Sequence, residues 1–182
     1  MVPEAPFERT EEGLLVAGEG WFVLNAREAR WRDRPGRGRA LGFEGKTKFP
    51  QLGVALYVLE PGEPIGMYHW EANQEDFLVL AGECLLLIEG EERRLEAWDF
   101  VHCPPDTEHG FVGAGEGPCV IFMTGARKGW PEKGIVYPRS ELALRHGAGT
   151  ERQTTSPAEA YASLPKWRPG RPETWDGLPW AR

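Results

Sequence analysis

The feature that most constrains this 182-residue chain is a series of short apolar stretches in its centre, each ended by glycine or proline. The stretches are rich in Val, Leu, Ile and Phe, and turns such as Glu60-Pro61-Gly62 separate them. Strands are predicted at residues 53–59, 77–80, 84–88, 93–96, 100–103 and 119–123. Short strands at regular spacing, with such turns between them, indicate an antiparallel sandwich or barrel.

The two ends of the chain differ from this centre. Ser140 as a cap and Gly147 as a stop predict one short helix, and Ser156 followed by Pro157 and Glu159 predicts another. We therefore divide the chain into an N-terminal arm (residues 1–50) with strands that pack on the centre, a central β unit (51–125) and a C-terminal arm (126–182).

The tail after residue 165 contains Trp167, Trp175 and Trp180 among proline and glycine. Such a tail is too aromatic for a free linker. We expect it to pack over the central unit or over a second subunit, with the indoles as anchors.

Charge and cysteine content exclude several classes of function. The net charge is −7, and residues 60–116 carry fourteen acids against two arginines, so we expect no nucleic-acid partner there. No apolar run of about 18 residues and no signal-peptide core are present, so we expect no membrane insertion. Cys84, Cys103 and Cys119 lack CxxC spacing and are expected to be reduced and buried in a cytoplasmic protein, with Cys103 the best placed for reactivity.

A basic stretch in the N-terminal arm contrasts with the acidic centre. The run RWRDRPGRGR at residues 30–39 has the charge to contact an anion, but its Pro and Gly favour a mobile loop. A basic arm of this kind is also suited to lie against the acidic unit of the same subunit or of a neighbour.

Four side chains near two of the turns are candidate metal ligands. His69, Glu71 and Glu75 lie at the start of an apolar strand, and His109 follows the Pro104-Pro105 turn. Imidazoles and carboxylates held on rigid strands bind divalent metals, and this set suits Zn, Mn, Fe(II) or Ni.

The segment from about residue 52 to 124 resembles the cupin superfamily. Its second motif, G-x5-P-x-G-x2-H-x3-N, is matched with changes: Pro104 and His109 are in place, while Trp98, Asp106 and Gly113 replace the two Gly and the Asn. The resemblance implies an antiparallel double-stranded β-helix, or jelly-roll barrel, with N- and C-terminal arms and, as is common in such proteins, a homodimer.

The first motif, G-x5-H-x-H-x3/4-E-x6-G, fits in two registers. Counting from Gly62 places Tyr68 and Trp70 at the two His positions, whereas one extra residue places His69 and Glu71 there. Side chains alternate along a strand, so these pairs face opposite ways. Because a metal binds imidazole and carboxylate rather than Tyr and Trp, we prefer His69 and Glu71, with Glu75 and His109.

The remaining candidates have other expected roles. Tyr57, Tyr68 and Gln74 are expected to orient the ligands, and Trp70 and Trp98 to pack. His102 is expected outside the pocket, because alternation places it opposite its apolar neighbours, and His146 at a helix end.

The resemblance therefore predicts a metal-binding protein that acts on, or binds, a small polar molecule such as a sugar derivative or keto acid. A metal-dependent isomerase or dioxygenase is one form of this hypothesis. A non-catalytic sensor or a degenerate barrel without metal is the alternative.

Overall fold

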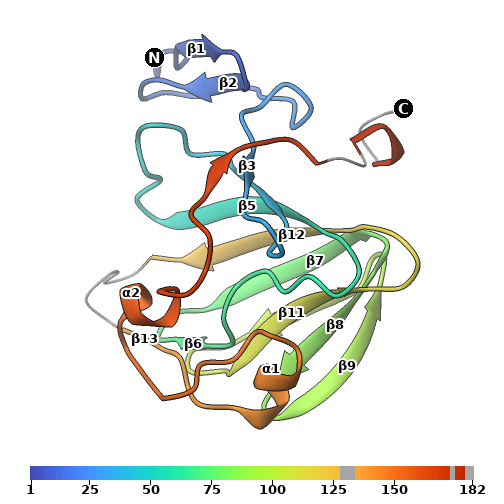
Figure 1. The fold of residues 1–182 in the computed structure, drawn as a ribbon. Coiled ribbons are helices and arrows are strands. Elements are labelled where there is room, and N and C mark those ends of the chain that lie inside the picture. Colours follow the sequence, from blue (N-terminus) through green and yellow to red (C-terminus); the bar gives the residue numbers. More distant parts are fainter. Residues whose placement is uncertain (128–133, 173–174, 179–182) are drawn as a thin grey trace.

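The centre of the computed structural model, which describes residues 1–127, 134–172 and 175–178, is a double layer of antiparallel strands (Figure 1). The order of neighbouring strands in the larger sheet is β10 (Phe100–Cys103), β7 (Glu75–Ala81), β12 (Cys119–Ala126), β5 (Leu52–Leu59), β4 (Arg39–Gly42), β3 (Arg32–Asp33) and β14 (Arg168–Pro169). The order in the smaller sheet is β11 (His109–Ala114), β8 (Glu83–Ile88) and β9 (Glu91–Glu96).

Smaller elements surround this double layer. Two further strand pairs are β1 (Phe7–Thr10) with β2 (Gly13–Val16), and β6 (Trp70–Glu71) with β13 (Ile135–Val136). The helical elements are α1 (Glu141–Arg145), α2 (Pro157–Ala160) and the 3-10 turn η1 (Trp175–Gly177). In Figure 1 the β1–β2 hairpin lies beyond one end of the double layer, and α1 and α2 lie beside the other.

The main core lies between the two layers because apolar residues alternate along the strands. Phe77 and Val79 of β7 and Ile121 of β12 pack against Leu86 of β8 and Phe111 of β11, and all five are buried. Burying a side chain of this size contributes about 1.5–3 kcal/mol. This core fixes both sheets rigidly, which allows side chains at the end of the barrel to be held in a defined geometry.

The arms cover much of the outer face of the larger sheet. Trp31 is completely buried there, packs in one cluster with Leu41, Leu56 and Leu178, and donates from its indole Nε1 to the carbonyl of Ala26 at 2.8 Å. The tail therefore packs over the central unit at Leu178, and the indole of Trp167, one of the predicted anchors, stacks on the guanidinium groups of Arg32 and Arg34 in the N-terminal arm. The side chain of Trp175 and all of Trp180 lie outside the described residues.

The predicted jelly-roll fold is confirmed, and all six predicted strands and both short helices are present. Ser140 and Ser156 accept from the backbone N–H of Ala143 and Glu159, as expected of helix caps. The basic run at 30–39 forms the β3–β4 hairpin of the larger sheet instead of a mobile loop. The division of the chain into three parts stays a prediction.

The sequence did not predict strand β11, which provides one of the candidate ligands. Gly110 and Gly113 interrupt its apolar pattern. At Gly113, however, a Cβ atom would lie 2.1 Å from the carbonyl oxygen of Glu60. The close approach of these two backbone segments therefore requires glycine.

The cysteines are free and buried, as predicted, and the cytoplasmic location inferred from them stays a prediction. Burial raises the pKa of the Cys103 thiol to about 12, which argues against the reactive role considered for it. None of the helices in the described ranges is long and apolar enough to cross a membrane.

Candidate metal centre

Two histidines face each other across a pair of antiparallel strand segments. The N–H of His69 donates to the carbonyl of His109 at 3.0 Å, and the N–H of His109 donates back to His69 at 2.8 Å. Directly paired residues project on the same side of a sheet. The two imidazoles therefore lie together, with ring centroids 4.9 Å apart.

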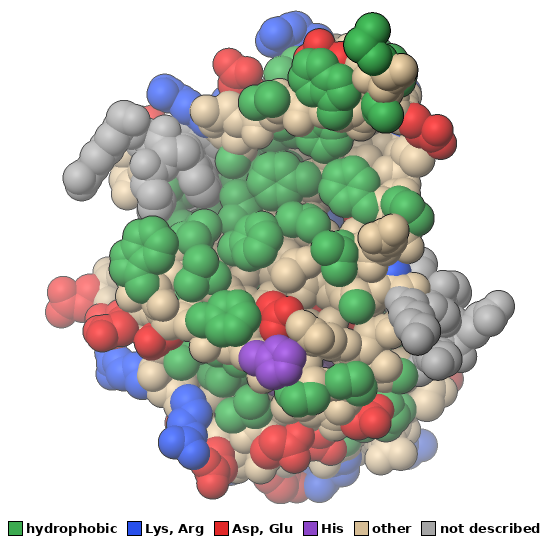
Figure 2. Space-filling view, turned by 180° about the vertical axis from the view of Figure 1, so that it is seen from behind, with side chains coloured by type: hydrophobic (Ala, Val, Ile, Leu, Met, Phe, Trp, Pro, Cys, Tyr) green, Lys and Arg blue, Asp and Glu red, His purple; other side chains and the backbone are tan. Residues whose placement is uncertain are grey.

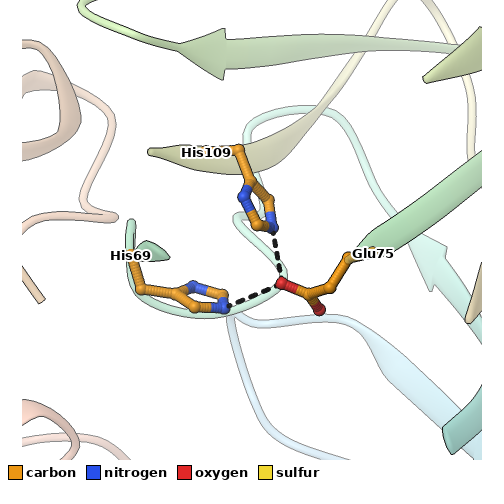
Figure 3. A group of neighbouring side chains, drawn as sticks. All are labelled: His69, Glu75 and His109. Carbon is orange, nitrogen blue, oxygen red and sulfur yellow. Dashed lines mark ion pairs between the residues drawn. The ribbon is translucent and has the colours of Figure 1, made fainter. Parts of the chain in front are cut away.

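The third member of the group is Glu75, the first residue of β7 in the opposite sheet. Its Oε2 lies 3.3 Å from Nε2 of His109 and 3.8 Å from Nε2 of His69. Figure 3 shows the three side chains pointing toward one another. Their donor atoms all lie within 4.8 Å of each other, and among the described residues no other group of three His, Cys, Asp or Glu side chains does so.

Both imidazoles are held in the tautomer that a metal ligand needs. The Nδ1 of His69 lies 2.7 Å from the carbonyl oxygen of Met67, and the Nδ1 of His109 lies 3.0 Å from that of Thr107. Because a carbonyl oxygen only accepts, each Nδ1 carries a proton and donates it. The Nε2 of each ring is then directed toward Glu75, and a ring in its neutral form presents a lone pair there.

The charges of the three groups also suit a cation. Burial and the neighbouring His109 lower the pKa of His69 to about 4, so His69 is neutral at pH 7. Burial acts to raise the pKa of Glu75, but the two histidines outweigh it and the pKa is lowered. Burial acts to lower the pKa of His109, but Glu75 outweighs it and the pKa is raised. Glu75 is therefore an anion shared between two imidazoles.

The residues present fit a divalent metal. Oε2 of Glu75 is buried and accepts no hydrogen bond, which is costly unless another partner is supplied. Two ligands bound 2.0–2.1 Å from one metal at a tetrahedral angle lie about 3.4 Å apart. The spacings of 3.3 and 3.8 Å from this oxygen are close to that value.

Glu71, the fourth predicted ligand, lies beside the group of three. Its Oε1 is 3.9 Å from Nε2 of His69, but its carboxylate is not within the 4.8 Å group. Burial and the neighbouring Glu75 raise the pKa of Glu71 to about 7. Its part in binding a metal stays a prediction.

The geometry answers the question of register. His69 faces Glu75 and His109, whereas Tyr68 faces the other way and is buried beneath α1 with Leu142 and Ala143. Neither Tyr68 nor Trp70 is among the residues that line the cavity beside the candidate ligands. The register that places Tyr68 at a His position of the motif is wrong, because the alternation of side chains along the strand directs Tyr68 into a separate apolar cluster.

Two of the three predicted orienting donors are corrected, whereas Tyr57 lines the cavity and its orienting role stays a prediction. The phenol oxygen of Tyr68 accepts from the N–H of Gly90, and Gln74 donates to Asp76 at an exposed position. Backbone carbonyls two residues before each histidine orient the rings instead. No sequence signal identifies such carbonyls, because every residue has one.

The other two histidines lie where they were expected. His102 is half exposed and its Nδ1 pairs with Asp76 at 2.6 Å. His146 caps the end of α1 and pairs with Glu92 at 2.9 Å. Trp98 differs from expectation, because it is 75% exposed instead of packed. It has a positive φ of 78°, a backbone conformation that favours glycine, the residue that Trp98 replaces in the motif.

The candidate metal centre opens into a cavity of about 340 Å³. Apolar side chains form much of its wall, including Ile65, Phe77 and Met123. Residues from both arms complete the lining, and these are Arg34, Tyr161 and Trp167. Sequence reasoning did not place these three at the site, although Arg34 belongs to the basic run and Trp167 to the aromatic tail.

Comparison with known proteins supports the fold. Residues 55–125 match the family model described as "Cupin domain". No curated protein matches the chain.

Several solved structures are similar to the chain. KdgF from Halomonas sp. is 27% identical, with a TM-score of 0.50, over 60% of this chain and 96% of that protein. An RmlC-like cupin from Shewanella frigidimarina is 19% identical, with a TM-score of 0.50, over 59% of this chain and 91% of that protein. A provisionally named sugar phosphate isomerase from Acidithiobacillus ferrooxidans is 24% identical, with a TM-score of 0.48, over 56% of this chain. The match spans 65% of that isomerase, less than two thirds of its length.

Proposed function

Because this chain carries a domain of the cupin superfamily over residues 55–125, we propose that it binds a divalent metal and acts on a small polar molecule in its cavity. The observation that carries the proposal is the buried Oε2 of Glu75, which faces Nε2 of His69 and of His109. Glu71 is the proposed fourth ligand. Zn, Mn, Fe(II) and Ni are the ions that suit these donors.

The opening of the ligand group into a cavity favours a reactive site over a structural one. Reactive metal sites keep a coordination position open for water or substrate, and ions such as Mn and Fe(II) bind more than four ligands, so a fourth protein ligand at Glu71 would still leave a position open. Here His69, Glu75 and His109 form a compact group, and all three line the cavity. A bound ion would act as a Lewis acid that polarises an oxygen of the molecule in the cavity. Isomerisation and dioxygenation are the reaction classes that we propose to test.

Metal analysis tests the first half of the proposal. Elemental analysis of protein purified without added metal, followed by calorimetric titration of the chelated protein with each ion, should give one ion per chain. His109→Ala should abolish this binding. The matched control is His102→Ala, since His102 is half exposed and outside the group. Binding of no ion by the wild type would favour a degenerate barrel.

A ligand screen tests the second half. Shifts in melting temperature of the metal-loaded protein, measured over sugars, sugar acids and keto acids, should identify a binding class. Conversion of that ligand by the wild type, lost in His109→Ala, would establish an enzyme. Saturable binding without conversion would instead assign the protein as a sensor or carrier.

We also propose that the chain forms a homodimer. Large hydrophobic side chains remain exposed, among them Trp21, Val23, Leu52, Trp98 and Phe100. Figure 2 shows hydrophobic side chains spread across the face of the molecule seen from behind. Large exposed apolar patches mark interfaces in many proteins, and we propose that these residues contribute to one. Sedimentation should give twice the chain mass of 20.4 kDa, and a monomer at micromolar concentration would contradict the proposal.

A further inference from the structure

Arg34 lines the same cavity as the candidate metal centre, but it comes from the N-terminal arm, outside the matched residues 55–125. It lies at the turn of the β3–β4 hairpin. Its N–H donates to the carbonyl of Gly38 at 3.2 Å, and its own carbonyl accepts from the N–H of Arg37 at 2.8 Å. The backbone that carries this guanidinium is therefore fixed.

Glycine holds this turn close to the larger sheet. Gly38 has a φ of 75°, and a Cβ atom there would lie 2.6 Å from the carbonyl oxygen of Val58 in β5. Only glycine permits so close an approach without displacement of the neighbouring strand. The Pro and Gly of the basic run thus position Arg34.

The guanidinium of Arg34 is stacked on aromatic rings and has no acidic partner within residues 1–127, 134–172 and 175–178. Its Cζ lies 4.6 Å from the ring centre of Trp167 and 5.1 Å from that of Tyr161. Its Nε is buried and makes no hydrogen bond, and no ion pair joins it to another described residue. Stacking fixes the plane of the cation while leaving its donors unused.

Other arginines of the arms differ in this respect. Arg39 pairs with Asp33 at 3.1 Å, Arg168 pairs with Asp33 at 2.8 Å, and Arg37 donates to the carbonyl of Gly66 at 3.1 Å. Each of these contacts joins one part of the fold to another. Arg34 instead presents its charge to the cavity.

The charge of the cavity favours an anionic ligand once a metal is bound. A divalent ion, the anion of Glu75 and the cation of Arg34 sum to a positive charge, which remains positive if the adjacent Glu71 is ionised. The cavity volume of about 340 Å³ is near the lower end of the range for small-molecule sites. Its apolar walls suit the carbon skeleton of a small organic molecule.

We propose that Arg34 binds the carboxylate of a small organic acid whose second oxygen group faces the metal centre. This inference rests on the proposed function for the metal half of the site, and it names the class of ligand. The planar fork of a guanidinium matches a carboxylate with two parallel hydrogen bonds. A phosphate dianion would bring a second charge, for which the described cavity lining offers no second arginine or lysine.

Matched pairs of acid and amide test the proposal. The probes are lactate and lactamide, mandelate and mandelamide, and glucuronate and glucuronamide, titrated by calorimetry into the full-length protein with and without Mn²⁺. At least one acid should bind tenfold or more tightly than its amide. In Arg34→Met this preference should fall to about twofold or less, while Mn²⁺ affinity stays unchanged.

Two further variants keep the test decisive. Arg34→Lys keeps the cation but not the fork, so it should retain part of the preference even if Arg34→Met unfolds. Arg30→Met is the matched control, because Arg30 lies on the same arm but pairs with Glu12 at 3.8 Å. The preference of Arg30→Met for acid over amide should equal that of the wild type.

Several outcomes would overturn the carboxylate assignment. The first is equal binding of acid and amide in every pair, and the second is a preference for acid over amide that persists in Arg34→Met. The third is that none of the three acids binds, and the fourth is that inorganic phosphate binds in their place and depends on Arg34. Failure of Mn²⁺, Zn²⁺, Fe²⁺ and Ni²⁺ alike to bind, with an Arg34-dependent preference intact in the metal-free protein, would instead reject the metal half of the proposed function. The two hypotheses therefore fail in different measurements.

Discussion

Two glutamates of this protein, the buried Glu44 in the N-terminal arm and the half-buried Glu75 in the candidate metal centre, are partnered in opposite ways. Glu44 accepts from both guanidinium NH groups of Arg127, one of them at 2.8 Å, and from the N–H of Phe49 at 2.9 Å. Glu75 faces two imidazoles, and its Oε2 accepts no hydrogen bond. The chain supplies a permanent cation to the first carboxylate and none to the second.

This difference separates a structural contact from a binding site. Arg127 follows β12, so its pairing with Glu44 joins the N-terminal arm to the larger sheet. A buried pair of this kind is fully matched within the fold. At Glu75 the facing groups are two imidazoles, of which His69 is neutral at pH 7, so a divalent ion would supply a charge that the chain does not fix there.

The largest expected effect is on stability, at Glu44. Glu44→Ala leaves the guanidinium of Arg127 without its carboxylate and should lower the free energy of unfolding by about 3 kcal/mol. Urea denaturation measures this loss. Glu116→Ala, at an exposed position, is the control and should change stability by less than about 0.5 kcal/mol. A loss in the free energy of unfolding below about 1 kcal/mol for Glu44→Ala would contradict a structural role for this ion pair. Metal affinity should be unchanged in both variants.

The converse effect is expected at Glu75. Glu75→Gln keeps the shape of the side chain but removes the negative charge, so affinity for the preferred ion should fall at least about a hundredfold. Residues that only orient a metal ligand already contribute about tenfold to a hundredfold. Calorimetric titration measures the change. Denaturation of the metal-free variant should show a change of less than about 1 kcal/mol, and a larger loss would mean that Glu75 is a structural residue like Glu44.

A smaller effect is expected at Glu71. Its carboxylate lies 3.9 Å from Nε2 of His69, beside the group of three rather than within it. Glu71→Gln should therefore lower metal affinity about tenfold, less than Glu75→Gln does. Equal losses in the two variants would instead make Glu71 a full ligand, and the same titration distinguishes these results.

The smallest expected effect is a change with pH. Burial acts to raise the pKa of Glu44, but the hydrogen bonds from Arg127 and from the N–H of Phe49 outweigh it and lower this pKa below its ordinary value of 4.5. A lowered pKa in the folded state adds stability that is present above pH 4.5 and lost as the pH falls through the folded pKa. The difference in the free energy of unfolding between wild type and Glu44→Ala should therefore narrow as the pH falls through this acidic range, as urea denaturation at several pH values would measure. A gap that widened on acidification would show that the sign is wrong.

Local features of the sequence were sufficient for most of the fold. The strands at 84–88 and 119–123 were predictable because their runs of apolar residues are flanked by glycine and proline. The helix caps were predictable because the side chains of Ser140 and Ser156 accept hydrogen bonds from backbone N–H groups three residues later. Strand β11 was missed because its two glycines weaken the local signal. Glycine is required at position 113 because the backbone segment at Glu60 passes close to it, and no local pattern in the sequence reveals that contact.

The sequence by itself determined the β unit and, through motif spacing and strand alternation, the candidate ligands His69, Glu75 and His109. These signals lie within short stretches of chain, where the period of side chains along a strand is fixed. Only the tertiary structure decided that Glu75 lacks a permanent cation while Glu44 has one, and that Arg34 reaches the same cavity. Such contacts join residues that are far apart in the chain, and their distances depend on how two sheets and two arms pack.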